Sequence, residues 1–148
     1  MSFYTRFKSA PHSVVVRCTE DGVLVGRTLQ VELDFYSEVL DENGLCLPEA
    51  AFGELEDMVR AIFADRLLIS QQDPYADHLI KLKRIAVADP ALFEFGTSGN
   101  ALSYHMGKKA EEWLSRAKWN PAPDDVGRVK IALSTVRLGD REFFYDYA

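Results

Sequence analysis

Histidines and cysteines are the side chains that most often bind metals or act as nucleophiles, and this sequence has three and two of them, respectively. They are His12, His78, His105, Cys18 and Cys46. Their spacing contains no H-x-H, H-x-x-x-H or C-x-x-C motif, so no local metal site is predicted. The sequence also lacks the G-x-S-x-G motif and glycine-rich phosphate loops. We expect both cysteines to be free thiols.

Arg27 is the charged residue in the most unusual position. Residues 28–35, T-L-Q-V-E-L-D-F, alternate polar and apolar side chains, which predicts a strand with one apolar face. Arg27 has the parity of Leu29 and therefore lies on the apolar face if the strand is regular. A local bulge would turn it to solvent instead. On the apolar face, its guanidinium could bind a carboxylate or a phosphate through two hydrogen bonds.

The N-terminal half is expected to form an antiparallel hairpin and then a helix. The two strands cover 3–18 and 23–38, and the turn Thr19–Gly22 between them contains a glycine that can adopt positive φ. Pro48 suits the first turn of a helix because its missing N–H would have no partner there. Apolar residues then recur every three or four positions, which predicts a helix over about 48–66.

The C-terminal half is expected to contain helices and a second hairpin. A short helix over 74–85 is followed by a loop over 86–97 with at most a short extended piece, because Pro90 and Gly96 interrupt any period. Thr97 or Ser98 caps the next helix. The remaining expected elements are that helix, with an apolar stripe from Leu102 to Leu114, a strand near 129–133, a turn at 138–140 and a strand over 142–147. The order β-β-α-(α)-α-β-β predicts one α+β domain over 1–148.

The composition is that of an acidic globular chain. Of 148 residues, 47% are hydrophobic and 27% are charged, and the net charge is −6. These values exclude disordered and collagen-like classes. The acidic balance argues against nucleic-acid binding through clustered lysines and arginines. No apolar run approaches the roughly 20 residues that cross a bilayer, and the N-terminus has no signal-peptide pattern. We therefore expect a cytoplasmic protein without nucleic-acid or membrane partners.

Four fragments, taken in order, carry a resemblance to a known family. They are Ala10–His12, Leu24–Leu29, Ala64–Ser70 and Gly96–Asn100. Together with the order of elements, they resemble the 6-pyruvoyl-tetrahydropterin synthase and 6-carboxytetrahydropterin synthase family, whose motifs read A-A-H, L-H-G-H-x-F, L-D-H-x-x-L-N and P-T-S-E-N. The resemblance spans nearly the whole chain, with an extra stretch of residues between about 71 and 95.

The resemblance implies a fold and an assembly. Members of the family adopt the tunnelling fold, an antiparallel four-stranded sheet with helices on one face. Three subunits join their sheets into a barrel, two trimers stack as a hexamer, and the active sites lie between subunits. The resemblance thus leads us to expect a homo-oligomer of this chain, a hexamer built as a dimer of trimers, with a pterin-like small molecule as partner.

The family's zinc ligands are mostly missing. In the family, the A-A-H histidine and the two histidines of H-G-H hold a catalytic zinc ion. His12 matches the first of them, but Val25 and Arg27 stand at the other two positions. A valine cannot bind zinc, a guanidinium does not, and one imidazole is not enough. We therefore expect no cofactor and no metal, and without zinc the parent synthase activity is expected to be lost.

The remaining catalytic positions are altered as well. The family uses a cysteine before H-G-H as base and an Asp-His pair from L-D-H; Cys18 matches the cysteine, and Asp65 keeps the aspartate. Arg66 replaces the histidine, and an arginine stays protonated at neutral pH. The pair Asp77-His78 is a rival placement for this motif. A less favoured alternative retains synthase activity with His78 or His105 as replacement zinc ligands.

The pterin-binding residues are retained in part. The family glutamate that grips the ring falls near Leu133 or Ser134, neither of which has a carboxylate, and Glu142 on the adjacent strand is a substitute candidate. Thr97 and Ser98 match the family's T-S, whose groups line the ring site. With His12 and Arg27, these residues form the expected ligand site. The alternative is a structural or regulatory oligomer in which they serve packing and helix capping.

Overall fold

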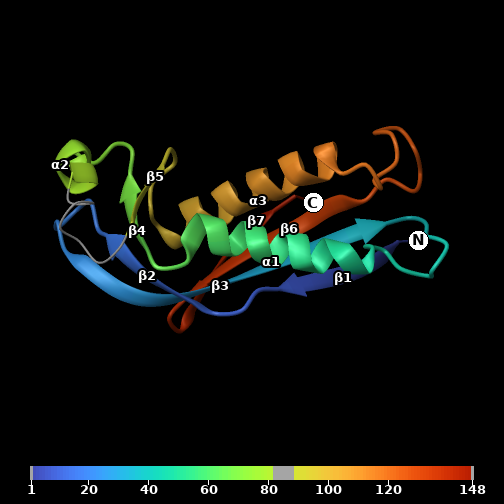
Figure 1. Cartoon of the computed structure of the whole chain (residues 1–148), viewed down its shortest axis with the longest axis horizontal. Helices are drawn as coiled ribbons and strands as arrows, with labels where there is room; N and C mark the ends of the chain where they lie inside the picture. Colours follow the sequence, from blue (N-terminus) through green and yellow to red (C-terminus); the bar gives the residue numbers. More distant parts are fainter. Residues whose placement is uncertain (1, 82–88, 148) are drawn as a thin grey trace.

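A single mixed sheet of seven strands organises the computed structural model, which describes residues 2–81 and 89–147. Two long helices lie side by side along it, and a short third helix lies near one end (Figure 1). In chain order the elements are β1 (Phe3–Lys8), β2 (His12–Arg17), β3 (Leu24–Ser37), α1 (Glu49–Phe63), β4 (Arg66–Ser70), α2 (Ala76–Lys81), β5 (Asp89–Phe93), α3 (Gly99–Arg116), β6 (Lys130–Leu138) and β7 (Arg141–Asp146).

The long strand β3 is the centre of the sheet. β1 and β2 pair antiparallel with successive parts of one edge of β3, and β6 followed by β7 extends the sheet from its other edge. The expected hairpin is therefore present, with its first strand broken at Ser9–Pro11. The break is fixed by Ser9, whose backbone N–H donates to the carbonyl of Val31 and whose hydroxyl accepts from the N–H of Val31. Pro11 has no N–H to continue the pairing.

The expectation of four antiparallel strands is wrong. β4 pairs parallel with β2, and β5 pairs parallel with β4, so the order is β5-β4-β2-β3-β6-β7 with β1 also on β3. β4 reads R-L-L-I-S and has no two-residue alternation, because Leu67, Leu68 and Ile69 are all buried. β5 is the short extended piece expected within 86–97.

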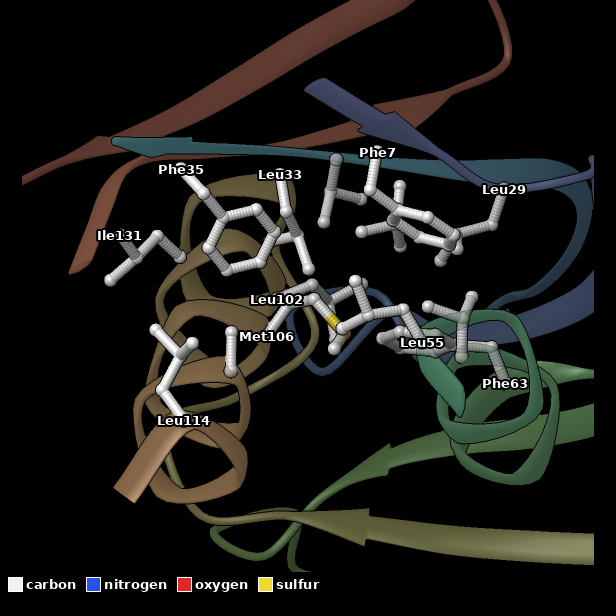
Figure 2. Close-up of a cluster of buried hydrophobic side chains, with 14 of the residues drawn as sticks. Phe7, Leu29, Leu33, Phe35, Leu55, Phe63, Leu102, Met106, Leu114 and Ile131 are labelled. Carbon is white, nitrogen blue, oxygen red and sulfur yellow. The ribbon is translucent and has the colours of Figure 1, made fainter. Parts of the chain in front are cut away.

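The main core lies between the sheet and the two long helices. Leu29, Leu33 and Phe35 of β3 point toward α1 and α3, where they meet Leu55 and Met106 (Figure 2). The α1 stripe is confirmed, although the helix ends at Phe63, before Asp65 takes a φ of 55°. A small polar side chain such as aspartate tolerates this left-handed conformation better than most residues do.

The short helix α2 covers the opposite face of the sheet. Leu79 of α2 packs on Leu67 and Ile69 of β4 in a second apolar cluster. Val15 borders this cluster, whereas its neighbour Val14 belongs to the main core, so the two clusters lie on opposite faces. The expectation of helices on one face is therefore wrong for α2. Residues 82–85 of the expected helix lie outside the described residues.

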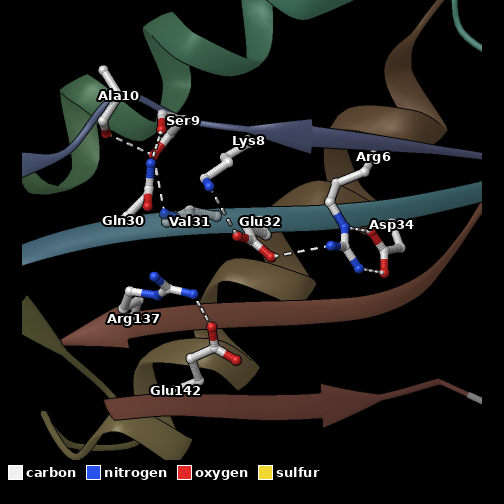
Figure 3. A network of polar contacts seen from close by, with 10 residues as sticks. All are labelled: Arg6, Lys8, Ser9, Ala10, Gln30, Val31, Glu32, Asp34, Arg137 and Glu142. Atoms are coloured by element: carbon white, nitrogen blue, oxygen red, sulfur yellow. Dashed lines mark hydrogen bonds and ion pairs between the residues drawn. The ribbon is translucent and has the colours of Figure 1, made fainter. Parts of the chain in front are cut away.

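The rest of this second face is polar around β1, β3 and β6. Arg6 pairs with Asp34 at 2.7 Å and with Glu32 at 3.7 Å, and Lys8 pairs with Glu32 at 3.8 Å (Figure 3). These ion pairs cross strands that are adjacent in the sheet. No helix within residues 2–81 and 89–147 is long and apolar enough to span a membrane.

Candidate ligand site at the N-terminus of α3

Thr97 and Ser98 connect the edge of the sheet to the start of α3. Thr97 is buried, and its Oγ1 donates a hydrogen bond to the carbonyl of Arg17 at 3.1 Å. Ser98 is the N-cap residue, and its Oγ accepts from the N–H of Ala101 at 3.1 Å, so the predicted cap is confirmed. The N-terminus of α3 is thereby held against the end of β2.

A partly buried ion pair lies at the same end of β2. The Nε of Arg17 is 3.0 Å from Oδ2 of Asp73, and the two side chains are 12% and 1% exposed. Arg17 also donates to the carbonyl of Gly22 and lies 5.8 Å from the centre of the Tyr75 ring. Two contacts hold the pKa of Asp73 below its usual value. The larger cause is the hydrogen bond from the N–H of Tyr75, and the guanidinium of Arg17 adds to it. Arg17 therefore joins the β2–β3 turn to the segment that leads into α2.

Cys18 follows Arg17 in this turn. Its N–H donates to the carbonyl of Val23, and its carbonyl accepts from the N–H of Gly22, both at 2.9 Å. The thiol is free and half-buried. The N–H of Val23 and then the Cys18 thiol lower the pKa of Asp21. Thr97 bonds to the carbonyl of Arg17, and Cys18 is the next residue after Arg17.

Arg27 keeps its predicted parity but is exposed. The pairing of Val14 with Arg27 belongs to a continuous β2–β3 register without a bulge, so Arg27 shares a face with Leu29. Its Nη1 donates to the carbonyl of Gly26 at 3.1 Å, and its stem lies beside Gly139 in the β6–β7 turn. Within the part of the chain that the structure describes, no carboxylate pairs with this guanidinium.

His12 and Asp65 lie near the other end of β2, His12 as its first residue and Asp65 in the α1–β4 turn. The Nε2 of His12 is 3.4 Å from Oε1 of Glu56 in α1, and the side chain is 10% exposed. Asp65 is exposed, and its N–H donates to the carbonyl of Ser13 at 2.9 Å. Asp65 therefore serves the α1–β4 turn, and these contacts do not bring it to Thr97.

Arg66, which the sequence resemblance matched with a family histidine, connects three elements. Its Nη1 donates to the carbonyl of Ala61 near the end of α1, and its Nη2 donates to the carbonyl of Pro90 in β5, both at 3.0 Å. A cation at a helix C-terminus also interacts favourably with the helix dipole. The arginine therefore has a structural role at the junction of α1, β4 and β5.

The residues present do not fit a zinc ion. His12 pairs with Leu29, whereas Val16, four residues later on β2, pairs with Val25. At about 3.3 Å per residue, His12 and Val25 are roughly 13 Å apart along the strands, too far to share one metal ion. Across residues 2–81 and 89–147, no three histidine, cysteine, aspartate or glutamate side chains gather as a metal site. This includes His78 in α2 and His105 in α3.

Glu142 lies on the other face of the sheet. Glu142 pairs in register with Arg137, and Arg137 pairs with Gln30. The side chain of Gln30 points to the face of the sheet opposite to that of its neighbour Leu29. The carboxylate of Glu142 forms an ion pair with Arg137 (Figure 3). The expectation that Glu142 substitutes for the family glutamate beside Thr97 is therefore not supported within one subunit, because the sheet separates the two side chains.

Ser134, near the family glutamate position, is buried under α3. Its hydroxyl donates to the carbonyl of Ser103 at 2.8 Å. Gly99, which follows the T-S pair, begins α3 directly against Phe143 of β7, and a Cβ atom on Gly99 would overlap the phenyl ring. The glutamate of the family's T-S-E-N motif would not fit here without movement of Phe143.

Comparison with known proteins supports a relationship in fold. No protein-family model and no curated protein matches the chain. An uncharacterized protein from Wolinella succinogenes, WS1659, matches 100% of this chain and 98% of its own with a TM-score of 0.72 and 12% identity. The 6-pyruvoyl tetrahydropterin synthase of Plasmodium vivax matches 98% of this chain and 97% of its own, with a TM-score of 0.69 and 11% identity. The chain has the fold of these synthases. A variant of the vivax enzyme in which a catalytic glutamate is replaced by alanine matches the same shares of both chains, with a TM-score of 0.64 and 9% identity.

Proposed function

We propose that this chain is a zinc-free homologue of the 6-pyruvoyl-tetrahydropterin synthases that binds a pterin- or guanine-like ring and lacks the parent synthase activity. The observation that carries the proposal is the hydrogen bond from Thr97 to the carbonyl of Arg17, which holds a T-S segment like that of the family against the β2–β3 turn. A ring bound at this segment would meet backbone groups at the start of α3.

We assign Arg27, which lies on the strand that pairs with β2, to the same ligand. Its guanidinium is exposed on β3 and bonds to its neighbour's carbonyl rather than to a carboxylate. An arginine binds a carboxylate or phosphate through two parallel hydrogen bonds, and it needs no metal to do so. We therefore assign to Arg27 the recognition of an anionic substituent on the ring. The loss of parent activity follows from the zinc ligands, which do not fit, and from Arg66, which cannot transfer protons at neutral pH.

The β2–β3 turn offers two groups for proton transfer. Cys18 corresponds to the family cysteine, and its thiol is free. Glu20 lies two residues later and is exposed. A carboxylate can act as a general base, so we include Glu20 as a second candidate. If the chain catalyses a reaction, comparison of the rates of the Cys18→Ser and Glu20→Gln variants would show which of the two side chains is the base.

Thr97→Val is expected to weaken pterin binding about tenfold or more. Valine has nearly the shape of threonine but cannot donate to the carbonyl of Arg17, so the T-S segment loses its attachment. Fluorescence titration of neopterin measures this effect. Ser115→Ala is the control, because Ser115 bonds only within the last turns of α3. Equal affinities for wild type and Thr97→Val would contradict the assignment.

We propose that the chain assembles as a hexamer, a dimer of trimers. β1 and β7 lie at opposite sides of the antiparallel part of the sheet, and each has one pairing partner among the described strands. Their free edges could join neighbouring copies, with the polar face around Arg6 and Glu32 inside the resulting barrel. Light scattering is expected to give six times the chain mass, and a monomeric mass would contradict this assembly.

A structural or regulatory oligomer is the second candidate. It is favoured by Ser134, whose hydroxyl is bonded beneath α3 at the place where the family has its ring-binding glutamate. In that case, no pterin analogue would bind, and Thr97 and Arg27 would serve packing alone.

A further inference from the structure

The loop that follows β3 and the loop that joins α3 to β6 lie at the end of the molecule away from α2 (Figure 1). Residues of these two loops line a groove. Its volume is about 550 Å³, within the range of small-molecule sites. The residues of the candidate site at the start of α3 do not line it. The groove is therefore independent of the function proposed above.

The walls of the groove combine apolar surface with negative charge. Its charged lining residues are Asp41 and Glu42, both acidic, and they come from the loop after β3. Burial, and then the charge of Asp41, raises the pKa of the half-buried Cys46 thiol, which also lines the groove. The apolar lining residues are Val39, Leu40, Pro48, Trp119, Pro121 and Val129. Apolar walls with a few convergent polar groups are typical of ligand sites.

Hydrogen bonds hold both sides of the groove in place. Oδ1 of Asp41 accepts from the N–H groups of Asn43 and Leu45, both at 2.9 Å. On the other side, buried Asn120 bonds to the carbonyl and the N–H of Val129. The hydroxyl of Ser37 lies within hydrogen-bond distance of carbonyls in both loops, those of Val39 and Gly127. The groove is thus formed before any ligand arrives, which lowers the entropic cost of binding.

We propose that this groove binds a small organic cation with an apolar body, such as an aromatic or quaternary amine. The carboxylates of Asp41 and Glu42 attract positive charge, and among residues 2–81 and 89–147 no lysine or arginine lines the groove to oppose them. Tryptophan is the aromatic side chain that binds cations best, and Trp119 lines the groove. The apolar walls accept the body of the ligand. An anion of the same size would meet two like charges.

The test uses two probes that share a ring and differ in charge. Benzyltrimethylammonium is expected to bind the full chain in calorimetry, whereas benzenesulfonate is not. The double variant Asp41→Asn/Glu42→Gln is expected to bind the cation about tenfold more weakly, because two charges are lost. Asparagine at 41 keeps an acceptor oxygen for the N–H groups of Asn43 and Leu45, so the loop is retained.

Alkylation of the cysteines locates the probe without a variant. The cation is expected to slow the reaction of Cys46 with iodoacetamide and to leave the reaction of Cys18, in the β2–β3 turn, unchanged. The proposal is overturned if the cation fails to bind, if both probes bind equally, if the double variant binds like wild type, or if Cys46 is not protected.

Discussion

Replacement of Asp73 with alanine is expected to lower the free energy of unfolding by about 1 to 3 kcal/mol, because the variant leaves the partly buried guanidinium of Arg17 without its charged partner and the N–H of Tyr75 without its acceptor. The pair joins the end of β2 to the segment before α2, and Arg17 also holds the β2–β3 turn through Gly22. Urea unfolding followed by circular dichroism measures the loss. Removal of both charges in Arg17→Met/Asp73→Leu should recover much of it, since the desolvation cost disappears with the pair.

The matched control is Glu142→Ala, which breaks the ion pair with Arg137 on the exposed face. Those side chains are 43% and 37% exposed, so the expected loss is below about 1 kcal/mol. Equal losses for Asp73→Ala and Glu142→Ala would show that burial of the Arg17–Asp73 pair does not stabilise the end of β2.

The same pair predicts a pH dependence. The pKa of Asp73 is lower in the folded chain than the usual value of about 3.9 in an unfolded chain. Its ionised form therefore stabilises the fold above that value, and this contribution is lost as the pH falls through the folded-state pKa. The difference in unfolding free energy between wild type and Asp73→Asn should be constant from about pH 7 to 5 and shrink below about pH 4. A difference that grows in acid would contradict the assignment.

Gly99→Ala is expected to lower the free energy of unfolding by about 2 to 3 kcal/mol, because the added Cβ would overlap the ring of Phe143 and force β7 and α3 apart. In a Phe143→Ala background the cost should fall close to zero, because the obstruction is gone. Thermal unfolding of the four proteins in this cycle measures the coupling.

Gly53→Ala is the control and is expected to act in the opposite direction. Gly53 lies within α1, and apart from its own helix backbone no atom of the described residues lies within 4 Å of where its Cβ would be. Alanine in a helix interior is favoured over glycine by about 0.5 to 1 kcal/mol. If both glycine variants changed stability alike, contact with Phe143 would not be the reason that Gly99 is a glycine.

Elements with a clear period could be predicted from the sequence. The alternation from Thr28 to Phe35 predicted the register face of β3, and the apolar stripes predicted α1 and α3. β4 was missed because Leu67, Leu68 and Ile69 form a continuous apolar run, which is also typical of a helix segment. The face covered by α2 depends on which side of β4 its apolar residues contact, and the sequence does not contain that information.

The candidate site was predictable where it depends on local sequence. Ser98 caps α3 as its type and position suggested, and Arg27 has the parity that the strand pattern gave it. The Arg17–Asp73 pair was missed because its members are 56 residues apart and meet only through the parallel pairing of β2 with β4. The face of the sheet on which Glu142 lies could not be predicted for a similar reason, since it depends on the β6–β7 register.

Calorimetric titration of the purified, metal-analysed chain with neopterin and a small panel of pterin and guanine analogues tests the central claim most directly. The proposed function predicts micromolar binding at one site per chain in protein that contains no stoichiometric zinc. If Thr97→Val and Arg27→Gln retained the affinity of wild type, the ligand would bind elsewhere on the protein. The absence of heat with every analogue, or one zinc ion per chain in the purified protein, would contradict the account.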